Sequence, residues 1–72
     1  MREKLNLSRS QIEDLINEWI LNERNRQIVT RRMCDGIPFE SLAEEFNLSV
    51  QRVKMIVYES KMEIYKHIPK GD

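Results

Sequence analysis

Gln51 and Lys54 stand three positions apart in a stretch of chain that contains neither glycine nor proline. On a helix this spacing places both side chains on neighbouring positions of one face. A glutamine amide can pair with the donor and acceptor of adenine, and a lysine ammonium can donate to the acceptors of guanine. Val50 and Met55 stand beside them and suit a thymine methyl, while Ser49 suits a phosphate at the start of the helix. These residue types at this spacing predict a surface that reads duplex DNA.

Three arginines are candidates for phosphate contacts around that surface. Arg52 lies next to Gln51, and Arg31 and Arg32 are expected at the end of an earlier helix. A guanidinium suits a phosphate because its N–H donors match the phosphate oxygens. Polar residues on an amphipathic helix most often form only its solvated face, and for Arg31 and Arg32 this interpretation stays open.

The first expected helix covers about 11–21, where apolar residues recur at the spacing of one helical face. These residues are Ile12, Leu15, Ile16, Trp19 and Ile20. Ser10 and Glu13 have the spacing of a capping box, in which each side chain bonds a free backbone amide of the other. This predicts that the helix begins just after Ser10.

A second helix is expected at about 23–35, although no glycine or proline separates it from the first. Its apolar residues Ile28, Val29 and Met33 point about 170° away from the first stripe at 100° per residue, so one continuous helix would need two cores. Asn22 suits the N-cap, and Gly36 suits the left-handed position after the last turn.

Two more helices are expected at about 38–46 and 50–66. Pro38 pre-sets the backbone for the first of them, and Asn47-Leu48-Ser49 form a tight turn before the second. The buried face of the last helix is expected to hold Val53, Ile56, Val57, Ser60 and Ile64.

No segment alternates apolar and polar residues as a strand does, so the fold class is predicted to be all-α. We expect one domain over residues 1–72 with three parts. Residues 1–9 are expected to be flexible, 10–21 to hold an extra N-terminal helix, and 22–68 to form a tri-helical helix-turn-helix core.

Four segments carry a resemblance to a known family: LNERNRQIV at 21–29, DGIPFE at 35–40, LAEEFNLS at 42–49 and VQRVKMI at 50–56. Together they make the chain from Leu21 to Ile68 similar to region four of bacterial sigma factors and to the small sigma-like proteins of phages and prophages. The resemblance implies a DNA-binding helix-turn-helix and a small phage or prophage transcription regulator. It also places Val50, Gln51, Lys54 and Met55 at the family's base-reading positions.

The sequence departs from the family pattern at three positions. Pro38 stands where the family often has a serine or threonine, so the hydroxyl cap is absent. Asn47 replaces a common glycine, and Val50 replaces a common charged residue, which changes the expected target sequence.

A second apolar strip is expected on the last helix, on the side away from its core: Tyr58, Met62 and Tyr65. We expect the first helix to pack on this strip through Ile12, Leu15 and Trp19, either within one chain or between the two chains of a homodimer. A dimer would read half-sites about 34–36 Å apart.

Composition limits the other function classes. The net charge is zero, but residues 46–72 hold five basic and three acidic residues, so a DNA-facing surface belongs there. The single cysteine, Cys34, and the single histidine, His67, form no catalytic or metal cluster, and His67 is expected to be inert. We therefore expect a cytoplasmic protein that is not an enzyme and uses no metal, cofactor, membrane or small-molecule ligand.

Its partner is expected to be double-stranded DNA. The alternative is an adaptor that binds RNA polymerase, a sigma factor or another phage protein.

Overall fold

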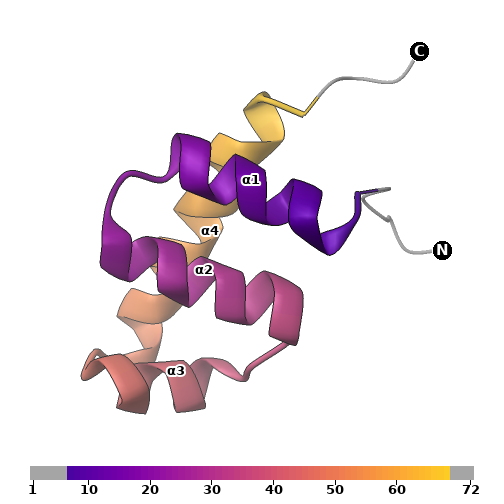
Figure 1. Cartoon of the computed structure of the whole chain (residues 1–72). Coiled ribbons are helices and arrows are strands. Elements are labelled where there is room, and N and C mark those ends of the chain that lie inside the picture. The colour runs from indigo at the N-terminus through magenta and orange to yellow at the C-terminus, as the bar shows by residue number, and fades with distance from the viewer. Residues whose placement is uncertain (1–6, 69–72) are drawn as a thin grey trace, which may run out of the picture.

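The computed structural model describes residues 7–68, and these form four helices (Figure 1). They are α1 (Arg9–Trp19), α2 (Glu23–Asp35), α3 (Phe39–Phe46) and α4 (Val50–Lys66). The described part of the chain contains no strand, so the predicted all-α class is confirmed. Figure 1 shows α3, α2 and α1 stacked one above another along α4, which contacts all three.

Apolar residues from every helix form one core around α4. The buried members are Ile16, Ile20, Ile28, Val29, Leu42, Ala43, Val53, Ile56, Val57 and Ile64. The face predicted for the last helix is confirmed, since Ser60 is buried together with the four apolar residues. This inward face leaves the opposite side of α4 to solvent.

The start of α1 differs from the prediction. Ser8, not Ser10, is the N-cap: its Oγ accepts from the amide of Gln11 at 3.3 Å, and the Gln11 Oε1 accepts from the amide of Ser8 at 2.9 Å. Glu13 instead accepts from Arg9 at 2.8 Å. A glutamine completes a capping box as well as a glutamate does, so α1 begins at Arg9 and ends at Trp19. Residues 1–6, part of the segment expected to be flexible, lie outside the described residues.

The boundaries of α2 agree with the prediction because the residues that cap its two ends can be recognised in the sequence. The side chain of Asn22 accepts from the amide of Asn25 at 3.0 Å. Gly36 adopts the left-handed conformation with φ 65°, and the following amide of Ile37 bonds back to the carbonyl of Arg31 at 3.2 Å. Pro38 is extended with ψ 151° and occupies the N-cap, so α3 starts one residue later than predicted.

The contact predicted for α1 within one chain is wrong. α1 packs on α2 and on the core face of α4, where Ile16 is fully buried and Ile12 and Leu15 lie against the core. Tyr58 and Met62 remain 65% and 48% exposed, so most of the second strip of α4 is left uncovered, and Tyr65 shares a hollow with Ile12 of α1. α1 thus covers part of the α4 core face beside α2.

The C-terminal end of α4 places His67, which was expected to be inert, in contact with α1. Its ring stacks on Trp19 with the two ring centroids 3.5 Å apart, and its Nε2 lies 3.3 Å from the carboxylate of Glu63. The hydrogen bond with His67 and the charge of Lys66 lower the pKa of Glu63. The contribution of the lowered pKa of Glu63 to folding stability is present at neutral pH and is lost as the pH falls through that pKa.

Candidate nucleic-acid interface

The turn between α3 and α4 fixes how α4 leaves the core. Asn47 is left-handed with φ 55°, and the amide of Leu48 bonds the carbonyl of Ala43 at 2.8 Å. Ser49 then caps α4 by accepting from the amide of Arg52 at 3.1 Å. The expected roles of Asn47 and Ser49 in this turn are confirmed. The turn directs the first two turns of α4 outward, with Val53 and Ile56 buried behind them.

Three of the four side chains expected to contact bases share the outer face of these turns. Gln51 and Lys54 are exposed and Met55 is 48% exposed, and all three line a shallow hollow together with Tyr58. Val50 is only half exposed because it packs against the core. The base-reading role remains a prediction for all four, but Val50 has less surface to offer.

The residues expected to contact phosphate fall into two groups. Ser49 and Arg52 are exposed at the start of α4. Arg31 pairs with Glu45 at 3.0 Å, and Arg32 donates to the carbonyl of Ile37 at 3.0 Å. Arg31 and Arg32 therefore already have partners within the protein, which sequence spacing could not indicate.

An aromatic residue that the sequence did not single out lies between α2 and the outer face of α4. The guanidinium carbon of Arg32 is 4.1 Å from the centroid of the Phe39 ring, and the Nζ of Lys54 is 5.8 Å from it. No local pattern could have indicated this cluster, because its members come from three different helices.

Acidic residues limit the directions from which a phosphate can approach. Glu40 and Glu44 of α3 line a hollow that Ser49 also lines. Their carboxylates repel a phosphate on that side of the turn. A phosphate at Ser49 must therefore lie toward Arg52 and α4.

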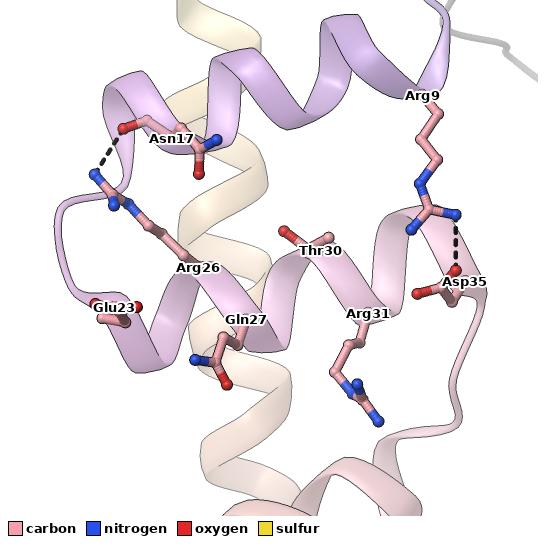
Figure 2. Close-up of a pocket in the computed structure, with 8 residues that line it drawn as sticks. All are labelled: Arg9, Asn17, Glu23, Arg26, Gln27, Thr30, Arg31 and Asp35. Carbon is pink, nitrogen blue, oxygen red and sulfur yellow. Dashed lines mark hydrogen bonds and ion pairs between the residues drawn. The ribbon is translucent and has the colours of Figure 1, made fainter.

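A polar groove between α1 and α2 is a second candidate site (Figure 2). Arg26 donates to the carbonyls of Ile20 at 2.6 Å and Asn17 at 2.7 Å, at the C-terminal end of α1. At the other end of the groove, Arg9 pairs with Asp35 at 2.9 Å, as Figure 2 shows. Both arginines connect α1 to α2, and Arg26 also satisfies carbonyls that the end of α1 leaves free. The polar groove is therefore part of the packing contact between α1 and α2.

Other kinds of site have little support within residues 7–68. No helix there is long and apolar enough to cross a bilayer. The same residues bring together no group of three or more side chains suited to holding a metal ion. Cys34 is a free thiol whose pKa is raised by burial, so it is less easily ionised than an ordinary cysteine.

Comparison with known families supports the geometry of α2, α3 and α4. Residues 20–60 match the model described as sigma-70, region 4. The chain belongs to the sigma-70 region 4 family. The match covers α2, α3, the turn and most of α4, while α1 lies before it. No curated protein and no solved structure matches the chain. The sigma-70 region 4 domain is a DNA-binding helix-turn-helix and not an enzyme family.

The N-cap of α4 gives a first testable prediction for this sigma-70 region 4 domain. Ser49→Ala is expected to lower the free energy of unfolding by about 1 kcal/mol, because the amide of Arg52 loses its side-chain acceptor. Urea unfolding followed by circular dichroism measures this loss. Ser41→Ala, an exposed serine on α3, is the control and should change stability by less than about 0.5 kcal/mol. Equal stability of the two variants would contradict the capping role.

Proposed function

We propose that this domain binds duplex DNA with sequence preference, through the first two turns of α4 inserted into the major groove. The observation that carries the proposal is the outer face of those turns. There Gln51, Lys54 and Met55 are exposed, while the opposite face is held in the core by a helix-turn-helix of the sigma-70 region 4 family. In such motifs the N-terminal residues of the second helix contact base edges.

Each of the three side chains has a distinct part in the proposed recognition. Gln51 pairs with adenine through its amide, and Lys54 donates to the acceptors of guanine. Met55 lies against a thymine methyl, with Val50 at the edge of the contact. Ser49 and Arg52 bind the flanking phosphates. Arg32 is a further contact through the N–H donors that its bond to Ile37 leaves free, and Arg31 is one when it leaves Glu45.

We also propose that the domain regulates transcription, as the small sigma-like proteins of phages and prophages do. Support comes from the family, which is a region of the sigma factors. The second candidate is an adaptor that binds RNA polymerase, a sigma factor or another phage protein. Its support is the net charge of zero, which weakens non-specific attraction to DNA.

Titration of a labelled random-sequence duplex at 50 and 200 mM salt separates the two candidates. With about three phosphate contacts, the affinity should fall roughly 40-fold over this range, since each contact releases counterions. Selection from the same random pool should then enrich a defined site. No duplex binding at 50 mM salt and about 100 μM protein, the weak end of non-specific affinities, would contradict DNA binding and favour the adaptor.

We propose further that a second copy of the chain covers the apolar strip, Tyr58, Met62 and Tyr65. The three residues are 41–65% exposed and are spaced by four and three positions, as in the seam between two paired helices. Zero net charge removes repulsion between copies, and two copies double the phosphate contacts of one. Because α1 is packed within its own chain, we propose that the two copies pair through this strip of α4.

Sedimentation over low to high micromolar concentration tests the homodimer. The wild type should dimerise, and Met62→Lys should be monomeric because a charge enters the seam. Leu21→Lys is the matched control, since Leu21 is 81% exposed and lies between α1 and α2, outside α4. A wild type that stays monomeric with and without DNA would overturn the dimer.

A further inference from the structure

Phe39 is the first residue of α3 and lies where three helices meet. Its ring is half-buried against the core and is therefore fixed in place. The Arg32 guanidinium carbon at 4.1 Å comes from the end of α2, and the Lys54 Nζ at 5.8 Å comes from the outer face of α4. Both distances lie within the range of about 6 Å over which an aromatic face attracts a cation.

Contact with a fixed ring restricts where the Lys54 ammonium can be. A lysine side chain has four flexible methylenes, and ordering it on binding costs conformational entropy. A lysine that already rests near an aromatic face has lost part of this freedom before DNA arrives. Lys54 is also one of the three exposed side chains on the base-reading face of α4.

Arg32 is held at two points, at the Phe39 ring and at the Ile37 carbonyl. The bond to Ile37 uses one of the five N–H donors of the guanidinium. Two positive charges thus gather around one ring, and they repel each other until an anion lies beside them. A DNA phosphate at the edge of the major groove is such an anion.

We propose that Phe39 is a positioning residue for DNA binding, whose ring orders Lys54 toward the bases and Arg32 toward the adjoining phosphate. The inference rests on the proposed function of the outer face of α4. Phe39 contacts no base itself and acts through the two cations. The effect of replacing Phe39 on DNA affinity should therefore depend on the presence of both Arg32 and Lys54.

The test compares Phe39→Leu with Phe46→Leu. Both phenylalanines are on α3 and half-buried against the core, but Phe39 is the one with cations over its ring. With both variants folded, Phe39→Leu should weaken binding to a selected duplex about fivefold to tenfold, from loss of two cation contacts. Phe46→Leu should weaken it less than about twofold, and Phe39→Trp, which restores an aromatic face, should bind like the wild type.

A double-mutant cycle separates positioning from a general effect on folding. In the Arg32→Ala, Lys54→Ala background, Phe39→Leu should have almost no further effect on affinity. An undiminished effect there, or equal affinity of Phe39→Leu and Phe46→Leu, would overturn the inference and leave the proposed function standing. Absence of duplex binding by the wild type would overturn both.

Discussion

Ile16→Ala is expected to lower the free energy of unfolding by about 2–5 kcal/mol, since it removes a large side chain from a closed site and leaves a cavity. Ile16 is fully buried and belongs to the same core as the helices of the family match. A domain of 72 residues has a total stability of only about 4–11 kcal/mol, so this one change should remove a large share of it. Urea unfolding followed by circular dichroism measures the loss.

Leu21→Ala is the control for this experiment. Leu21 lies two residues after the end of α1 but is 81% exposed, so its truncation should change stability by less than about 0.5 kcal/mol. If Ile16→Ala were as stable as Leu21→Ala, α1 would be a loosely attached extension and its packing on α2 and α4 would be contradicted.

Gln51→Ala and Lys54→Ala are each expected to weaken binding to the preferred duplex by about 1–3 kcal/mol, through loss of a base contact. Helix content and the thermal midpoint should hardly change, since both side chains are exposed. Anisotropy titration with the selected duplex and with variants carrying one altered base pair measures the effect. Each substitution should also relax the preference at the base pair that the side chain reads.

Matched controls distinguish base reading from a general loss of polar surface. Gln27→Ala removes an exposed glutamine from α2, and Lys66→Ala removes a lysine from the last turn of α4. Both controls should keep the sequence preference of the wild type. Unchanged affinity in Gln51→Ala and Lys54→Ala, with both folded, would contradict the assigned reading face.

Most of the fold could be predicted because its boundaries depend on local chemistry. Asn22, Gly36 and Ser49 each satisfy a helix end next to them in the chain, and the structure confirms α2 and α4 at the predicted bounds. The start of α1 was harder, because Ser8 and Ser10 are both followed three positions later by a residue able to complete the cap. Only the folded chain shows that Ser8 is used.

The contacts between helices could not be predicted in the same way. Periodicity showed which face of α1 is apolar, but not that this face meets the core of α4 in preference to its second strip. The pairing of Arg31 with Glu45 and the cations at Phe39 join residues distant in the chain. For the candidate site, the apolar periodicity of α4 was enough to predict that Gln51 and Lys54 are exposed, because it gave the buried face of the helix correctly.

Backbone amide NMR shifts during titration with the selected duplex test the central claim most directly. A labelled chain of 72 residues is small enough for each amide to be followed separately. The proposal predicts that the largest shift changes fall on residues 49–55 and on the side-chain amide of Gln51, with small changes in α1. Changes confined to α1 or to Tyr58, Met62 and Tyr65, with residues 49–55 unmoved, would contradict insertion of α4 into the groove.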